Sequence, residues 1–231
     1  MALSLVSLLF PPRCPCCGEK REQKEVLCKA CLALYQKQKY SYCEGCGKRR
    51  CRCSCRPAVA SGAVLSYLSV FRYRENSPGG RLILKIKARQ DKQISRFLAQ
   101  DLAGALQNGC ILEQGALITY VPRRKGSVLQ SGTDQAMDLA LELGERVNLP
   151  VVPLLERTKQ DRVAQKELSA KDRQEHARRI YLPKKDAPDL TGRQVILVDD
   201  VLTTGATMFV CAEHLKDLGA RQVVCLCVGR R

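Results

Sequence analysis

From residue 63 onward, apolar residues form short runs that alternate with segments of helical periodicity. The runs typical of buried strands lie at residues 63–73, 116–122, 151–152, 195–198 and 223–228. The segments typical of amphipathic helices lie at residues 81–88, 94–106, 134–147 and 208–218. The stretch 156–179 is polar and charged and shows no pattern of core-forming residues. Alternating strands and helices predict an α/β fold with a parallel sheet, which binds ligands at the carboxyl ends of its strands.

The run at 195–198 is followed by the most informative polar stretch of the chain. Two adjacent carboxylates come first, and the small hydroxyl-rich turn after them consists of Thr203, Thr204, Gly205, Ala206 and Thr207. Such a turn at the start of a helix offers free backbone N–H groups and a positive helix end to a phosphate. Asp199 and Asp200 then lie about where the vicinal hydroxyls of a sugar 5′-phosphate would lie. An ordinary exposed turn is the simpler interpretation of the two carboxylates alone, but the whole stretch favours a sugar-phosphate site.

Further cations are expected on the same edge of the sheet. Arg123, Arg124 and Lys125 follow the apolar run at 116–122. Because the carboxyl ends of parallel strands share one edge, these side chains are predicted to lie beside the phosphate turn. A solvated loop is the alternative for these residues taken alone.

Cysteine spacing indicates a separate module at the N-terminal end. Ten of the 14 cysteines lie before residue 56, and three pairs among them have C-x₂-C spacing. Two such turns can close one tetrahedral Cys₄ site. The predicted zinc ligands are Cys14, Cys17, Cys28 and Cys31 in one site, and Cys43, Cys46, Cys53 and Cys55 in the other.

Other interpretations of the cysteines stay open at this point. Cys51 competes for a place in the second site, and Cys16 is spare. An iron–sulfur cluster or a redox pair is an alternative, but paired C-x₂-C-G turns are typical of structural zinc in a segment poor in core residues. The apolar segment 1–10 lacks a basic region and a cleavage site and is too short to span a bilayer. It predicts a helix that packs on the cysteine module, and without an export signal we expect a cytoplasmic protein with reduced thiols.

The charge balance indicates an anionic partner. Lys and Arg number 39 against 23 Asp and Glu, a formal net charge of +16, which two Zn(Cys)₄ sites would lower to about +12. Nucleic acid and phosphorylated ligands are the leading candidates, and a merely basic surface is the alternative. Aromatic residues are few, and the candidates for stacking on bases are Tyr35, Tyr40 and Tyr42.

The stretch 195–207 resembles the phosphoribosyl pyrophosphate (PRPP) motif of type I phosphoribosyltransferases. With the cysteine module and the Val-Pro-Arg-Arg stretch at 121–124, it makes nearly the whole chain similar to the ComF family of competence-associated, phosphoribosyltransferase-like proteins with an N-terminal zinc ribbon. The resemblance implies a zinc module at 1–60 and a phosphoribosyltransferase-like domain at 61–231. It also implies that Asp199 and Asp200 are the catalytic ribose ligands, that 203–207 wraps the 5′-phosphate, and that Mg²⁺ accompanies PRPP.

The same resemblance carries a functional expectation. It implies a cytoplasmic factor that binds PRPP and single-stranded DNA and works with other DNA-uptake proteins in natural transformation. The competing hypothesis is an active phosphoribosyltransferase with an unidentified, nucleobase-like acceptor, and a scaffold with neither activity is the third. Ser131, Thr133 and Asp134 stand where relatives carry Arg, Phe and Asn. The lost cation argues against efficient transfer more than against PRPP binding.

Overall fold

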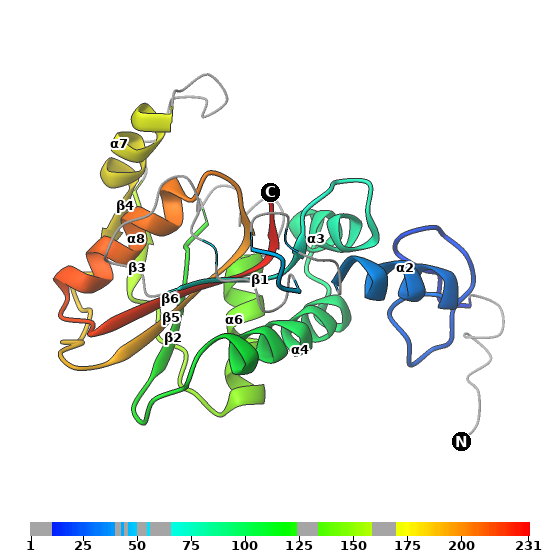
Figure 1. The fold of residues 1–231 in the computed structure, drawn as a ribbon, viewed down its shortest axis with the longest axis horizontal. Coiled ribbons are helices and arrows are strands. Elements are labelled where there is room, and N and C mark those ends of the chain that lie inside the picture. Colours follow the sequence, from blue (N-terminus) through cyan, green and yellow to red (C-terminus); the bar gives the residue numbers. More distant parts are fainter. Residues whose placement is uncertain are drawn as a thin grey trace.

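A computed structural model describes residues 11–39, 43, 46–49, 55, 66–123, 134–158 and 170–231. Four strands form a parallel sheet in the order β1-β6-β5-β2, and β3 and β4 pair as a separate antiparallel ribbon (Figure 1). The strands are β1 (Ser66–Arg72), β2 (Leu117–Tyr120), β3 (Leu155–Arg157), β4 (Tyr181–Pro183), β5 (Gln194–Leu202) and β6 (Gln222–Arg230). The helices are α2 (Lys29–Lys39), α3 (Pro78–Ala88), α4 (Lys92–Gly109), α6 (Gln135–Val147), α7 (Ala170–Ile180) and α8 (Ala206–Asp217). This topology confirms the predicted α/β fold.

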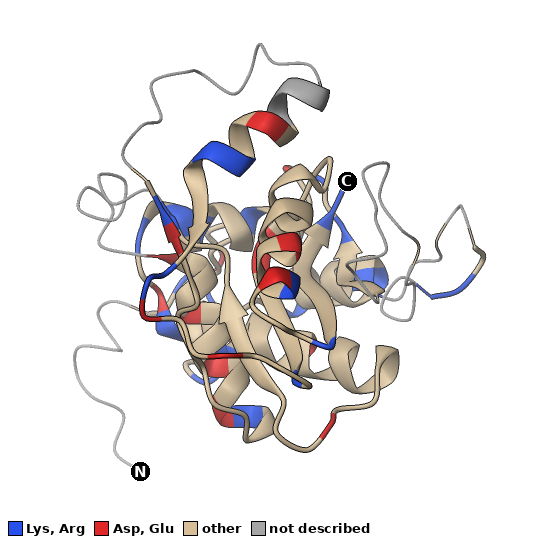
Figure 2. Cartoon of the chain, turned by 90° about the vertical axis from the view of Figure 1, so that its left-hand side faces the viewer, with Lys and Arg blue, Asp and Glu red and all other residues tan. Residues whose placement is uncertain are grey.

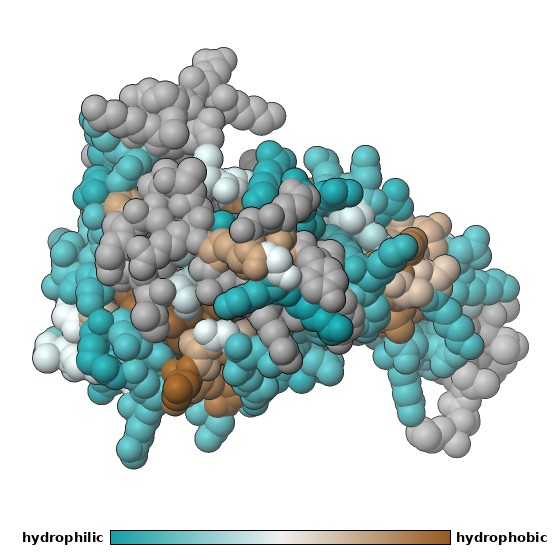
Figure 3. Space-filling model, viewed as in Figure 1, coloured by the Kyte–Doolittle hydropathy of each residue, from teal (hydrophilic) through white to brown (hydrophobic). Residues whose placement is uncertain are grey.

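Helices cover both faces of the sheet because its central strands are apolar on both sides. Successive residues of a strand point to opposite faces. In β5, Ile196 and Val198 pack in the core under α3, α4 and α6, whereas Val195 and Leu197 pack in the core under α8. The surface seen in Figure 3 is mostly hydrophilic, with apolar residues in small separate patches. The apolar side chains are therefore concentrated in two internal layers.

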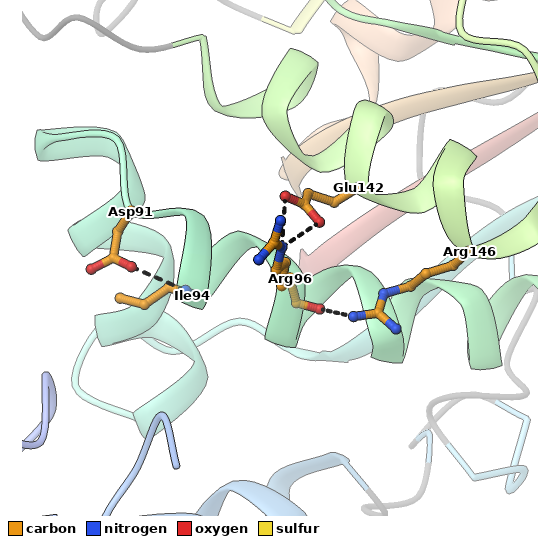
Figure 4. A network of polar contacts seen from close by, with 5 residues as sticks. All are labelled: Asp91, Ile94, Arg96, Glu142 and Arg146. Atoms are coloured by element: carbon orange, nitrogen blue, oxygen red, sulfur yellow. Dashed lines mark hydrogen bonds and ion pairs between the residues drawn. The ribbon is translucent and has the colours of Figure 1, made fainter. Parts of the chain in front are cut away.

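Polar contacts fix helix α4 and tie it to α6 (Figure 4). Oδ1 of Asp91 accepts a hydrogen bond of 3.1 Å from the backbone N–H of Ile94, which satisfies a donor that the first turn of α4 leaves free. The Arg96 guanidinium lies 3.2 Å from the Glu142 carboxylate, and Arg146 donates to the backbone carbonyl of Arg96 at 3.1 Å. These contacts hold the two helices side by side under the sheet.

The cysteine module is joined to the sheet domain through α2. The Tyr35 side chain is fully buried between Phe71 and Phe97, with ring centroids 5.8 and 5.1 Å away. Its hydroxyl donates to Oδ2 of the buried Asp101 on α4 at 2.6 Å, and Lys39 forms an ion pair with the same carboxylate. An aromatic residue with a hydrogen-bonded polar end is well suited to such an internal joint.

The structure corrects several sequence-based expectations. Tyr35 is wrong as a base-stacking candidate because it is buried, and Tyr40 and Tyr42 lie outside the described residues. The run at 151–152 forms only an isolated bridge between Val151 and Ile118 rather than a strand. The stretch 156–179 does contribute to a core, through α7, where Ala177 is buried. The segment 1–10 lies outside the described residues.

The remaining predicted elements are confirmed, although their bounds differ from the predicted ones by up to four residues in either direction. The largest difference concerns β5, which continues through Asp199 and Asp200 to Leu202. The two carboxylates are therefore part of the strand and not of the turn after it. Among the described helices, none is both long and apolar enough to cross a membrane.

Candidate functional site

Asp199 and Asp200 occupy neighbouring positions of β5 and therefore point to opposite faces of the sheet. Asp200 points toward α3 and α6, and it is 5% exposed. Its Oδ1 lies 3.2 Å from Nζ of Lys87, and its Oδ2 accepts a hydrogen bond of 2.8 Å from Nε2 of Gln135. Each carboxylate oxygen thus has a donor, as a buried polar group requires.

Asp199 lies in a less favourable environment. Its Oδ1 accepts a hydrogen bond of 2.8 Å from the backbone N–H of Asp200. Burial, followed by the negative charge of Asp200, raises the pKa of Asp199 well above its ordinary value, although this N–H group and the Lys87 ammonium act in the opposite direction. A carboxyl group with a strongly raised pKa in a cleft is typical of a functional site.

A cavity of about 320 Å³ opens over the two carboxylates. We call it the Asp199–Asp200 cavity, and its other polar lining residues are Lys87, Arg123, Asp134, Gln135, Arg157, Tyr181 and Thr207. Three cations and three carboxylates converge here from five different parts of the fold. Such a surface suits a ligand that carries both hydroxyls and phosphates, because carboxylates accept from hydroxyls and cations bind phosphate oxygens.

The turn at 203–207 has the geometry of a tight strand-to-helix connection. Gly205 has a φ of 87°, in the left-handed region that favours glycine, and its carbonyl accepts the first helical bond, from Phe209, at 2.8 Å. The Thr204 hydroxyl accepts from the N–H of Ala206 at 3.4 Å. Helix α8 begins at Ala206, so Thr207 belongs to its first turn, where it lines the cavity. The remaining first-turn N–H groups have no acceptor inside the helix, as an anion site requires.

Arg123 is fixed beside the cavity by its backbone and its side chain. Its N–H donates to Oδ2 of Asp134 at 3.1 Å, and its Nη1 lies 3.4 Å from the backbone carbonyl of Lys87. Asp134 also accepts from the N–H of Met137 at 3.3 Å and so caps α6, while burial raises the pKa of its carboxyl group. Arg124 and Lys125, which were predicted beside Arg123, lie outside the described residues.

The first cysteine cluster contains the four predicted ligands, Cys14, Cys17, Cys28 and Cys31. Their sulfur atoms all lie within 4.8 Å of one another, and those of Cys17 and Cys28 are 3.5 Å apart. A tetrahedral site with zinc–sulfur bonds of about 2.3 Å has sulfur–sulfur edges of about 3.8 Å, so this cluster fits zinc. Burial on its own would raise the pKa of Cys14, but backbone N–H groups, among them that of Cys28, lower it to about 6 and favour the thiolate that zinc needs.

The second cysteine cluster repeats the turn of the first. The N–H of Gly18 donates to the carbonyl of Cys14 at 2.9 Å, and Gly47 donates to Cys43 at the same distance. Both glycines have a positive φ, 78° and 67°. Cys43, Cys46 and Cys55 have sulfur atoms within 4.8 Å of one another. The fourth predicted ligand, Cys53, and its competitor, Cys51, lie outside the described residues.

Cys16 is not part of the first cluster, as expected for a spare cysteine. Its buried sulfur lies 3.5 Å from the carbonyl oxygen of Pro78, at the start of α3. Burial, followed by the charge of Cys14, raises the pKa of Cys16 to about 12, so the side chain is a neutral thiol. Arg81 of α3 donates to the backbone carbonyl of Cys16 in return. The knuckle between the ligands Cys14 and Cys17 is therefore anchored to α3.

Comparison with known proteins agrees with both parts of this site. The double zinc ribbon domain matches residues 5–63, and the phosphoribosyl transferase domain matches residues 127–231. "Competence protein F" of Haemophilus influenzae is 27% identical over 217 residues, which cover 90% of this chain and 92% of that protein. The chain is a homologue of Competence protein F. The match to a double zinc ribbon supports Zn²⁺ as the metal of its two cysteine clusters.

Further relatives match shorter parts of this Competence protein F homologue. A uracil phosphoribosyltransferase of Bifidobacterium animalis subsp. lactis is 33% identical over 58 residues, a quarter of each chain (25% and 27%). Among solved structures, the adenine phosphoribosyltransferase of Thermoanaerobacter pseudethanolicus has a TM-score of 0.37 at 17% identity and covers 68% of this chain and 87% of that one. The purine phosphoribosyltransferase of Pyrococcus horikoshii has a TM-score of 0.33 at 21% identity, with 58% and 81% covered.

Three lining residues of the Asp199–Asp200 cavity were not singled out from the sequence: Lys87, Gln135 and Tyr181. Lys87 has the helical position of an outward-facing residue, and only the packing of α3 against the sheet brings it to Asp200. Gln135 follows the residue that caps α6, so its location was predictable only after the helix start was known. Tyr181 begins a strand in a region that shows no core pattern in the sequence.

Proposed function

We propose that this chain is a ComF-type competence factor that binds PRPP with Mg²⁺ in the Asp199–Asp200 cavity and binds single-stranded DNA, assisting DNA uptake in natural transformation. The observation that carries the PRPP part is the convergence of the acidic pair, Thr207 of the helix α8 start, and three cations on one cavity. Each group on PRPP has a matching group on the protein. A plain exposed acidic turn would not bring these chemistries together.

In this proposal the two carboxylates hold the ribose hydroxyls. Thr203–Thr207 and the start of α8 bind the 5′-phosphate through N–H and hydroxyl donors. Arg123, Arg124 and Arg157 are assigned to the pyrophosphate, and the described Arg157 is held over the Tyr181 ring at 5.3 Å. Mg²⁺, when bound with PRPP, neutralises part of the pyrophosphate charge. The carboxylate and phosphate oxygens at this place are ligands that Mg²⁺ prefers.

The DNA part of the proposal has separate support. The chain carries a formal charge of +16, and contacts from Lys and Arg to a phosphate backbone need no sequence readout. The similarity to Competence protein F extends over 90% of the chain, well beyond residues 127–231, which match the phosphoribosyl transferase domain. We therefore place the chain in the cytoplasm, with a zinc module at 1–60, a phosphoribosyltransferase-like domain at 61–231, and other DNA-uptake proteins as partners.

An active phosphoribosyltransferase is the second candidate, and the match of the phosphoribosyl transferase domain to residues 127–231 favours it. Transfer would move ribose 5-phosphate from PRPP to an acceptor and release pyrophosphate. The acidic pair would hold the ribose while positive charge develops at C1, and the cations would stabilise the departing pyrophosphate. A nucleobase-like acceptor is the class to test first.

The proposal is tested by titrating PRPP and Mg²⁺ into the zinc-loaded chain by calorimetry. We expect binding by the wild type and none by the Asp199→Ala/Asp200→Ala variant. The matched control is Asp186→Ala/Asp189→Ala, which removes two exposed carboxylates that do not line the cavity and should bind PRPP normally. Absence of binding by the wild type would refute the PRPP part. Pyrophosphate release with nucleobases present would favour the transferase, and Asp200→Asn should then abolish turnover but not DNA binding.

A further inference from the structure

A second cavity lies between the zinc ribbon and the sheet domain. It measures about 380 Å³ and lies between the first cysteine cluster on one side and helices α3 and α4 on the other. Arg13 and Arg21 line it from the zinc ribbon, and Lys85 and Arg89 line it from the end of α3. We call it the basic cleft, after these four residues. It is separate from the Asp199–Asp200 cavity, with which it shares no lining residue.

The four cations of the basic cleft lie close together and have no carboxylate partner among the described residues. Within the described ranges, none of the four forms an ion pair. The basic residues that do pair elsewhere are Lys39 with Asp101, Lys87 with Asp200, Arg96 with Glu142, Arg178 with Glu213 and Arg221 with Glu113. On the side of α7 and α8, acidic and basic residues are interspersed (Figure 2). The cleft therefore concentrates positive charge that the protein itself leaves uncompensated.

Asp91, the one carboxylate among the described lining residues of the basic cleft, has another task. Oδ1 of Asp91 accepts from the N–H of Ile94 and caps α4 (Figure 4). The Arg21 guanidinium is held in place by carbonyl and amide oxygens, which include Arg13 O at 3.2 Å, Glu22 O at 3.3 Å and Gln93 Oε1 at 3.0 Å. Neutral acceptors orient this cation without cancelling its charge. A held cation loses little freedom when an anion binds.

We propose that the basic cleft binds the phosphate backbone of a single nucleic-acid strand. This inference rests on the DNA part of the proposed function and gives it a location. Four cations on two facing walls suit successive phosphates of a strand better than one small anion. Among the described residues no aromatic side chain lines the cleft, so we expect binding that does not use base stacking and is indifferent to base identity.

The competing explanation is that these cations only offset the thiolates of the first cysteine cluster. Cys14 lines the same cavity, and Arg13 is adjacent to it in the chain. Offsetting the thiolates can account for Arg13, whose Nη1 is also bonded to Gly18 O at 3.1 Å. It does not account for Lys85 and Arg89, which are exposed and come from the sheet domain. These two residues are therefore the ones to change.

The test measures the affinity of the zinc-loaded full chain for a labelled oligothymidylate by fluorescence anisotropy over a range of salt concentrations. Four phosphate contacts predict a slope of log K against log salt of about −2.8, and Lys85→Ala/Arg89→Ala should reduce its magnitude by about 1.4. Lys185→Ala/Arg193→Ala is the control, since it removes the same charge from exposed residues that do not line the basic cleft. It should leave the slope unchanged, and oligocytidylate should bind as oligothymidylate does.

Each outcome decides between the explanations. If the two double variants changed the salt slope of strand binding equally, the cleft would not be the binding site. The same conclusion would follow if Lys85→Ala/Arg89→Ala lost zinc but kept the salt slope of the wild type. A wild type that binds no strand would overturn both the location and the DNA part of the proposed function. The PRPP titration is independent of this test, because neither double variant changes a residue that lines the Asp199–Asp200 cavity.

Discussion

The hydroxyl of Tyr35 lies 2.6 Å from Oδ2 of Asp101, and this hydrogen bond joins the helix of the zinc ribbon to the longest helix under the sheet. Both side chains are buried. The contact makes the zinc ribbon a part of the folded core rather than a tethered appendage. Asp101 has a second partner, the ammonium of Lys39, which also comes from the zinc ribbon.

Tyr35→Phe should therefore destabilise the whole chain. The change leaves the volume in place but removes a donor from a buried carboxylate, at a cost of about 1.5–3 kcal/mol. Chemical denaturation of the zinc-loaded protein measures the loss. Tyr73→Phe is the control, because Tyr73 is only partly buried and should change the free energy of unfolding by less than about 0.5 kcal/mol. Equal losses would contradict the role of the Tyr35 hydroxyl.

Lys87→Met should weaken PRPP binding about tenfold, or about 1.4 kcal/mol. The Lys87 ammonium lies 3.2 Å from Asp200 and lowers the pKa of the Asp199 carboxyl. Without this ammonium the Asp199 carboxyl group ionises less readily, so on lowering the pH the variant should lose PRPP binding at a higher pH than the wild type does. Calorimetric PRPP titrations over a pH series check this. Lys92→Met, an exposed lysine on α4, removes the same charge and should behave as the wild type.

Asp199→Asn should stabilise the fold while it abolishes PRPP binding. Burial raises the pKa of Asp199 in the folded chain, so between its ordinary value of about 4 and the raised value the folded state binds more protons than the unfolded state. Wild-type stability therefore falls as the pH rises through this interval, and the asparagine avoids that loss. We expect a gain of about 0.5–2 kcal/mol above the interval and a vanishing difference near pH 4. Urea denaturation at several pH values measures it, and a variant less stable than the wild type at neutral pH would contradict the assignment.

The zinc content of cysteine variants should distinguish the predicted zinc ligands from the spare Cys16. Cys17→Ser should remove one zinc ion per chain and destabilise the ribbon, because the remaining three thiolates no longer close the site. Cys16→Ala should retain all zinc, since the Cys16 sulfur contacts Pro78 instead. Metal analysis after gel filtration measures both. Cys53→Ser and Cys51→Ser extend the test to the second site, where we expect only Cys53→Ser to lose zinc. Loss of zinc in Cys51→Ser alone would overturn the predicted ligand set.

Contacts between residues close together in the chain could be predicted from the sequence, whereas contacts between distant residues could not. The acidic pair and the turn at 203–207 are contiguous, and so are the C-x₂-C-G turns, so their geometry follows from local chemistry. The contact between Lys87 and Asp200 joins residues far apart in the chain, and it depends on how α3 packs on the sheet. The burial of Tyr35 likewise depends on two aromatic neighbours from β1 and α4. Periodicity fixes which residues share a face of one helix but not which partner that face meets.

The last turn of helix α3 and the residue that caps it carry three cations that line two different sites. Lys87 contacts Asp200, whereas Lys85 and Arg89 line the basic cleft. A helix of 11 residues, about three turns, moves as one body. A ligand that displaces α3 at one site would therefore alter the other site. Thermodynamic reciprocity then requires that a strand in the cleft change the affinity for PRPP by the same factor by which PRPP changes the affinity for the strand. In such an arrangement the sugar phosphate acts as an effector of strand binding, whether or not it is ever consumed.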